Sequence, residues 1–167
     1  MTLARDARER VLTLLREVMD PEVPVVSVVD LGIVRDVELS DEGAVTVVVT
    51  PTYSGCPAMR VIEEDIVGAL AAGGFPEARV RTVYSPAWTT DWIGAEAREK
   101  LRRYGIAPPP RAEAAELVPL LRRAPRVECP YCASMNTALR SEFGSTACKA
   151  IMFCGDCRQP FELFKSI

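Results

Sequence analysis

The sequence predicts an α+β protein, with a small α-β-β-α-β domain followed by a C-terminal zinc ribbon. Three observations indicate this architecture. Within residues 1–84, the spacing of the hydrophobic residues is typical of a helix, two strands, a second helix and a third strand, in that order. Two C-x-x-C pairs follow near the C-terminus, in the pattern of a four-cysteine zinc site. A run of three prolines, Pro108–Pro110, forms a stiff spacer between the two parts.

The first part contains five expected elements. Residues Leu3–Met19 carry an apolar stripe at helical spacing. Val- and Ile-rich runs at Ile33–Leu39 and Ala44–Thr50, joined by a short polar turn, predict two hairpin strands. A second helix is expected from Pro57 to the glycines at Gly73–Gly74, because proline suits a first helical turn and glycine a helix end. Alternation over Arg79–Tyr84 predicts a third strand.

The segment after the third strand carries two tryptophans. Asp91 is expected to cap a short helix that ends at Gly105. Trp88 and Trp92 are four residues apart, so they would share one side of a helix. They either pack that helix onto the sheet or form a surface for docking a partner.

We expect three regions in total. Residues 1–107 form the α+β domain with the tryptophan-containing helix, residues 108–125 form a proline-rich linker with a helix at Arg111–Arg123, and residues 126–167 form the ribbon. Within the ribbon, strand-like runs occupy Thr137–Phe143 and Ala147–Phe153.

Composition excludes several functions. The chain has no histidine, so it cannot form a Ser-His or Cys-His nucleophile pair or a histidine-containing di-iron site. We therefore expect no di-iron oxygenase activity from this chain alone, and its status as an enzyme stays open. A net charge of −3 gives no reason to expect nucleic acid binding, and no apolar run reaches membrane-spanning length. A cytoplasmic protein is expected, where thiols stay reduced and cysteine clusters usually bind metal.

The four paired cysteines are the expected metal ligands: Cys129, Cys132, Cys154 and Cys157. Each C-x-x-C turn directs two thiolates at one ion, and two such turns complete a tetrahedral site for structural zinc. The sequence does not separate zinc from iron in the same four sulfurs. Cys129-Pro-Tyr-Cys132 also resembles a dithiol redox motif, but the residues that follow it are poor helix formers. Cys148 is either a packed ribbon residue or a transient ligand.

Cys56 stands apart from the other cysteines. It precedes Pro57 and the second helix, whose positive end would stabilise a thiolate, so it is a candidate for a functional thiol that binds a ligand. The alternative is a small buried side chain. Asp20, Glu22 and Asp30 are possible supporting residues, or else Asp20 and Asp30 cap turns and Glu22 is solvated.

Residues 1–84 resemble a known family. The motifs DPE at Asp20–Glu22, DLG at Asp30–Gly32 and TPTYSGCP at Thr50–Pro57 are similar to the SufT-like iron–sulfur assembly family. This resemblance implies a transient iron–sulfur cluster as a possible cofactor, with Cys56 as the candidate cluster-handling thiol, in addition to zinc in the ribbon.

The whole chain resembles a narrower family. SPAWTTDWIGAEAREKLRRYGIAPP, CPYC, EFGSTACKA and CGDCRQPFELF are similar to D subunits, also called J, of bacterial phenylacetyl-CoA epoxidase systems. The resemblance implies an accessory or maturation component in phenylacetate catabolism. The expected partners are the oxygenase subunit, the iron–sulfur reductase, or both. The alternatives are a non-catalytic docking subunit and a thiol redox protein.

Overall fold

The computed structural model describes residues 2–40, 42–110 and 126–165, with side chains from residue 5 onward. The chain forms two compact units, Met1–Gly94 and Ala95–Ile167, which we treat separately. The expected linker helix at Arg111–Arg123 lies outside the described residues.

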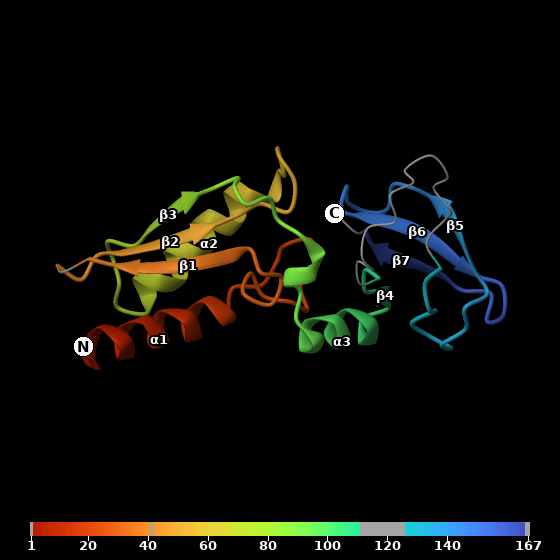
Figure 1. Cartoon of the computed structure of the whole chain (residues 1–167), viewed down its shortest axis with the longest axis horizontal. Coiled ribbons are helices and arrows are strands. Elements are labelled where there is room, and N and C mark those ends of the chain that lie inside the picture. Colours follow the sequence, from red (N-terminus) through yellow and green to blue (C-terminus); the bar gives the residue numbers. More distant parts are fainter. Residues whose placement is uncertain (1, 41, 111–125, 166–167) are drawn as a thin grey trace. The chain divides into compact units, whose positions relative to one another are not determined.

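The first unit is a three-stranded mixed sheet with two helices (Figure 1). Its elements are α1 (Thr2–Arg16), β1 (Val34–Leu39), β2 (Val45–Val49), α2 (Ala58–Ala72) and β3 (Arg79–Thr82). The central strand β2 pairs antiparallel with β1 and parallel with β3. The predicted α-β-β-α-β order is confirmed, and the ends of its elements differ from the predicted ends by at most three residues.

The core of the first unit follows the predicted periodicities. Val11 and Leu15 of α1 are fully buried, as are Ile66 and Leu70 of α2. Alternate residues of β2 are also fully buried, because the side chains of a strand point to opposite faces in turn. This large apolar core gives the first unit a source of stability that needs no metal.

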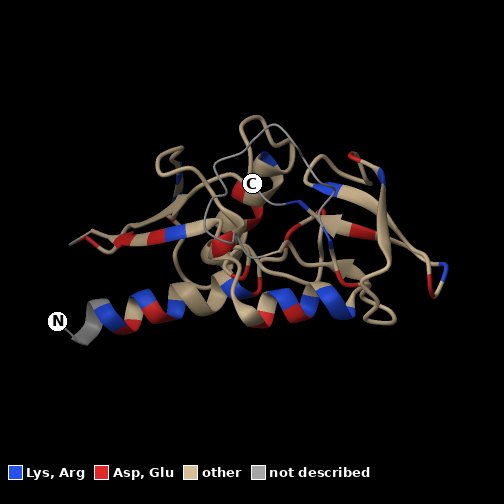
Figure 2. Cartoon of the chain, turned by 45° about the vertical axis from the view of Figure 1, so that its right-hand side comes forward, with Lys and Arg blue, Asp and Glu red and all other residues tan. Residues whose placement is uncertain are grey.

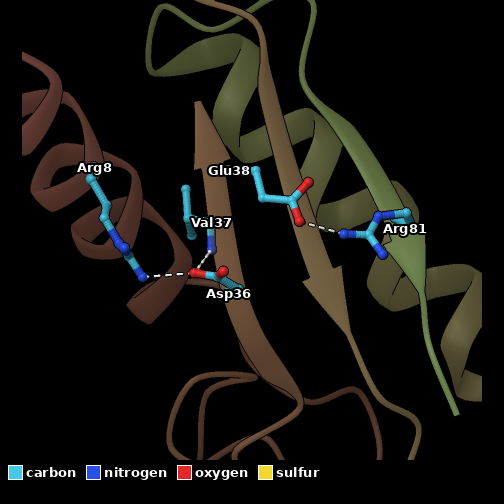
Figure 3. Close-up of polar contacts among 5 residues, drawn as sticks. All are labelled: Arg8, Asp36, Val37, Glu38 and Arg81. Atoms are coloured by element: carbon cyan, nitrogen blue, oxygen red, sulfur yellow. Dashed lines mark hydrogen bonds and ion pairs between the residues drawn. The ribbon is translucent and has the colours of Figure 1, made fainter. Parts of the chain in front are cut away.

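The strand β1 carries two acidic side chains, Asp36 and Glu38, each of which contacts an arginine. Arg8 of α1 contacts the carboxylate of Asp36 at 2.7 Å, and Arg81 of β3 forms an ion pair with Glu38 (Figure 3). All four side chains are about half exposed. Figure 2 shows acidic and basic residues interspersed along α1, so this helix presents no patch of a single sign.

The tryptophan segment differs from its prediction. Thr89, not Asp91, is the capping residue, and it caps a single 3₁₀ turn at Thr90–Trp92. The helix begins later, at Ala95, so Trp88 and Trp92 do not share a helical face. The prediction failed because Thr89 also has a capping side chain, and its hydroxyl accepts the Asp91 N–H.

The second unit contains α3 (Ala95–Arg103) and a four-stranded sheet in the order β4-β7-β6-β5. The strands are β4 (Ile106–Ala107), β5 (Thr137–Ser141), β6 (Lys149–Cys154) and β7 (Pro160–Phe164). β5, β6 and β7 are antiparallel neighbours, and β4 pairs parallel with β7. The division of the chain after Gly94 therefore differs from the predicted boundaries at 107 and 125, because β4 adds a strand to the ribbon sheet.

No helix in the described part of the chain is long and apolar enough to cross a membrane.

Candidate functional site

The four predicted cysteine ligands meet at one point of the ribbon. Their sulfur atoms all lie within 4.8 Å of one another. The Cys129 and Cys157 sulfurs are 3.7 Å apart, and those of Cys132 and Cys154 are 3.6 Å apart. A tetrahedral site with Zn–S bonds of about 2.3 Å requires sulfur separations of roughly 3.8 Å, so this donor set fits a zinc ion.

Two similar turns supply these sulfurs, and we call them the first knuckle (Cys129–Cys132) and the second knuckle (Cys154–Cys157). Each is followed by a residue with positive φ, Ala133 at 60° and Arg158 at 57°. The Cys129 N–H donates to the Ser134 carbonyl, and the Cys154 N–H donates in the same way to that of Gln159. The knuckles therefore repeat one backbone geometry, which aims two thiols at a common centre.

The thiols of the two knuckles differ in proton affinity. Backbone N–H groups of Cys157 and Asp156 point at the Cys154 sulfur and lower the pKa of that thiol to about 7. Burial raises the pKa of Cys157 to about 12. The N–H of Ser134 favours a lower pKa for Cys132, but burial and the neighbouring sulfurs together raise that pKa above its ordinary value. A metal ion must displace these protons when it binds.

Cys148 is not part of this group of four. It lies directly before β6, is buried, and its sulfur is 3.1 Å from the Thr146 hydroxyl. The first knuckle, in turn, leads into a left-handed residue and then β5 rather than into a helix. It therefore lacks the helix dipole that activates the first thiol of redox C-x-x-C motifs.

Cys56 lies in the other unit, just ahead of α2. Its side chain is partly exposed. Gly55, at φ +84°, turns the chain, and Pro57 occupies the N-cap position without offering a side-chain acceptor. The Cys56 carbonyl accepts the Met59 N–H at 3.2 Å, which fixes the cysteine to the first turn of the helix.

The three acidic residues of the DPE and DLG motifs lie in turns. Asp20 is buried, and one carboxylate oxygen accepts the N–H groups of Glu22 and Val23, both at 2.8 Å. Asp30 accepts the N–H of Ser27 and donates its own N–H to the Ser27 hydroxyl. Asp20 and Asp30 thus stabilise two successive turns, and Glu22 is half-buried beside them.

Both tryptophans contact the DLG turn. Trp88 is buried and its indole N–H donates to the Leu31 carbonyl at 2.9 Å. Gly32 has φ +69°, and a Cβ at this position would lie only 2.8 Å from the Trp92 Cβ. The Arg35 guanidinium stacks on the Trp92 ring at 3.4 Å from its centroid. In this structure the segment thus packs within its own unit.

Thr50 is the first residue of the TPTYSGCP motif, but it was not among the predicted site residues. It is 1% exposed, and its hydroxyl has no hydrogen-bond partner among the described residues. Its N–H donates to the Ile33 carbonyl at 2.9 Å, which joins the start of the Cys56 loop to the segment after Asp30. A buried polar atom without a partner costs about 1–3 kcal/mol, so such atoms often mark functional sites. The sequence signal that could have identified Thr50 was its position at the end of β2, in the motif TPTYSGCP.

Comparison with known proteins matches both units. A family model described as iron–sulfur cluster assembly protein matches residues 8–84, and one described as PaaD zinc beta ribbon domain matches residues 114–165. The chain is 35% identical over 94 residues to an Fe–S protein maturation auxiliary factor of Porphyromonas gingivalis, covering 56% of this chain and 89% of the relative.

A solved structure and a full-length relative extend this result. The structure of a domain of unknown function from Bacillus anthracis has 27% identity and a TM-score of 0.55, and the match covers 58% of this chain and 92% of that one. The putative 1,2-phenylacetyl-CoA epoxidase D subunit of Escherichia coli K12 is 46% identical over 166 residues, or 99% of this chain and 97% of the relative. The chain belongs to the family of phenylacetyl-CoA epoxidase D subunits, which joins an iron–sulfur assembly domain to a zinc ribbon.

Proposed function

We propose that this protein is an accessory maturation factor of a phenylacetyl-CoA epoxidase, acting in the cytoplasm on the metal centres of the other subunits. The observation that carries the proposal is the position of Cys56. In a domain that matches the iron–sulfur assembly family, this cysteine is partly exposed and fixed at the start of a helix.

The surroundings of Cys56 suit transient binding rather than storage of a cluster. It is the one cysteine of residues 1–94, so this unit cannot supply four thiolates to a cluster. The remaining ligands would come from a client protein, either the oxygenase or its iron–sulfur reductase. The Thr50 hydroxyl at the start of the same loop, which has no hydrogen-bond partner in the described part of the chain, supports a ligand site in this region.

The ribbon would have a structural role in this proposal. Its four thiols would hold one zinc ion, which supplies a cross-link between the knuckles and no chemistry of its own. Zinc in a one-to-one ratio to the chain, measured on protein purified without oxygen, would support this assignment; iron in its place would contradict it. Acid-labile sulfide in a sample that also holds one zinc per chain would report an iron–sulfur cluster outside the ribbon site.

The central test is the variant Cys56→Ser in a strain that lacks the wild-type gene. We expect normal folding and zinc content, slow growth on phenylacetate, and oxygenase or reductase subunits deficient in iron. Cys148→Ser is the matched control, because it also removes a thiol outside the four-sulfur group, and growth should stay normal. Normal growth of Cys56→Ser, with fully loaded clients, would contradict the proposal.

A second candidate is a docking subunit without a role in assembly. It is favoured by the name of the Escherichia coli relative, which describes a subunit. Stable co-purification with the oxygenase at fixed stoichiometry, together with iron-replete oxygenase in a strain lacking this protein, would favour docking over maturation. A disulfide reductase assay of the isolated protein tests the thiol redox alternative, and we expect no activity.

A further inference from the structure

The two knuckles have the same backbone geometry but different residues at their third position. In the first knuckle this residue is Tyr131, which packs beside Gly105, where a Cβ would lie 2.7 Å from the tyrosine hydroxyl. In the second knuckle it is Asp156, and its side chain reaches the residues that follow the first knuckle. The metal site is thus asymmetric beyond its four sulfurs.

Asp156, in the second knuckle, contacts two residues that follow the first knuckle. One carboxylate oxygen accepts the side-chain N–H of Asn136 at 2.7 Å, and the other accepts the hydroxyl proton of Ser134. Ser134 and Asn136 lie two and four residues after Cys132, the last residue of the first knuckle. The backbone N–H of Asp156 meanwhile points at the sulfur of Cys154 in its own knuckle. We call the side-chain contacts among Asp156, Ser134 and Asn136 the knuckle bridge.

Further contacts hold the knuckle bridge in shape. The Ser134 hydroxyl accepts the Asn136 N–H at 3.0 Å, and the Asn136 carbonyl accepts the Gly155 N–H at 2.8 Å. A Cβ on Gly155 would lie 2.6 Å from the Asn136 side-chain nitrogen, so only glycine allows this approach. The exposed surface of the bridge makes its purely electrostatic contribution to folding small, because water screens exposed charges.

Each knuckle supplies two of the four sulfurs. Separation of the two knuckles would therefore break two of the four Zn–S bonds and leave an ion that a competitor can remove. We propose that Asp156 is the positioning residue that resists this separation, so that the knuckle bridge sets how slowly the ribbon loses its zinc. Partners outside the ligand set commonly change metal affinity by about 10–100-fold.

The test is the rate of zinc transfer from the full chain to a chromogenic chelator at neutral pH. Asp156→Ala should release zinc roughly 10–100-fold faster than wild type. Ser134→Ala and Asp156→Asn, which each retain part of the knuckle bridge, should show intermediate rates. Cobalt-substituted protein should keep the absorption spectrum of a four-thiolate site in each variant, because no ligand is changed.

Glu128→Ala is the matched control. Glu128 is exposed and adjacent to Cys129, as Asp156 is adjacent to Cys157, so both variants remove one negative charge next to a ligand. The control should release zinc at the wild-type rate. Equal acceleration by both variants would mean that charge alone matters and would overturn the proposal, as would a wild-type rate for Asp156→Ala.

A double variant gives a further check. Both variants remove the contact between Ser134 and Asp156, so the acceleration in the double variant Ser134→Ala/Asp156→Ala should fall well below the product of the two single accelerations. Ser134→Ala adds only the loss of the hydroxyl that accepts the Asn136 N–H. Accelerations that multiply in full would show independent roles and contradict the proposal. If Asp156→Ala did not load zinc, the release rates of Ser134→Ala and Asp156→Asn would decide the question by the same criteria.

Discussion

The Cys56 loop and the ribbon knuckles differ in what holds them in place. The start of the Cys56 loop is joined by a main-chain hydrogen bond to the segment after Asp30, above an apolar core built from two helices and a sheet. The ribbon core is a smaller cluster that includes the ligands Cys129 and Cys154 themselves. The Cys56 loop, which is held above an apolar core, should therefore keep its structure without metal. The ribbon cysteines, which form part of their own core, should not.

Removing the ribbon metal should have the largest effect, and it should affect the two units differently. We expect a chelator, or serine at any one of Cys129, Cys132, Cys154 and Cys157, to unfold the ribbon while the first unit stays folded, because so small a core needs the ion. Amide hydrogen exchange of β6 and α2 measures both units in one sample. Surviving protection of β6 without metal would contradict the prediction.

Acid should act in the same direction as the chelator. The metal-free ribbon binds protons at Cys132 and Cys157, because the fold raises their pKa values and an unfolded thiol still has a pKa of about 8.5, whereas the metal-loaded ribbon does not. The loaded form therefore binds fewer protons, so its advantage grows as pH rises and is lost as pH falls. Zinc release followed from about pH 8 down to about pH 4 should precede any unfolding of the first unit.

Gly32→Ala should be the most damaging small change in the first unit. It forces alanine into a left-handed conformation, at about 1–2 kcal/mol, and places a methyl group against Trp92, at roughly 1–3 kcal/mol more. Gly43→Ala is the control: its φ is also positive, at +85°, but nothing lies within 4 Å. Denaturant unfolding of the zinc-loaded chain measures both, and an equal loss in the two variants would remove Trp92 as the cause.

Thr50→Val should stabilise the first unit, in contrast to Gly32→Ala. Valine fills nearly the same volume without the unpaired hydroxyl, so the free energy of unfolding should rise by about 1 kcal/mol. Thr82→Val serves as the comparison, because the Thr82 hydroxyl donates to Glu63 at 2.8 Å and its loss should destabilise the unit. Destabilisation by Thr50→Val would show that the hydroxyl has a structural partner and would weaken its link to the Cys56 site.

Arg81→Ala should have the smallest effect. Arg81 forms an ion pair with Glu38 (Figure 3); both side chains are about half exposed, and such pairs contribute less than about 1 kcal/mol. The difference from wild type should shrink further in high salt. A larger and salt-independent loss would show that Arg81 supports the sheet by packing rather than by charge.

The parts of the fold that follow from local pattern were predictable from the sequence. Helical spacing marked α1 and α2, Val-rich runs marked β1 and β2, and paired C-x-x-C turns marked the metal ligands. In these segments the type of secondary structure, or of metal ligand, can be inferred from residues a few positions apart. The cap at Thr89 was missed because two nearby side chains could both have performed that role.

The contacts that shape the two candidate sites were not predictable in this way. Asp156 and Ser134 are 22 positions apart in the chain, and Trp88 and Leu31 are 57 apart. No local period encodes such pairs, and they become visible only when the strands are placed. The same is true of Thr50, whose missing partner is a property of the folded interior.

The two-residue strand β4 has a practical consequence for dividing the chain. Because β4 pairs with β7, a fragment that begins at residue 126 would leave the β7 edge without its neighbour. Open strand edges recruit other chains, so such a fragment should self-associate or precipitate even when fully loaded with zinc. A fragment that begins at Ala95 retains α3 and β4 and should stay monodisperse, which makes it the proper starting point for studying the ribbon alone.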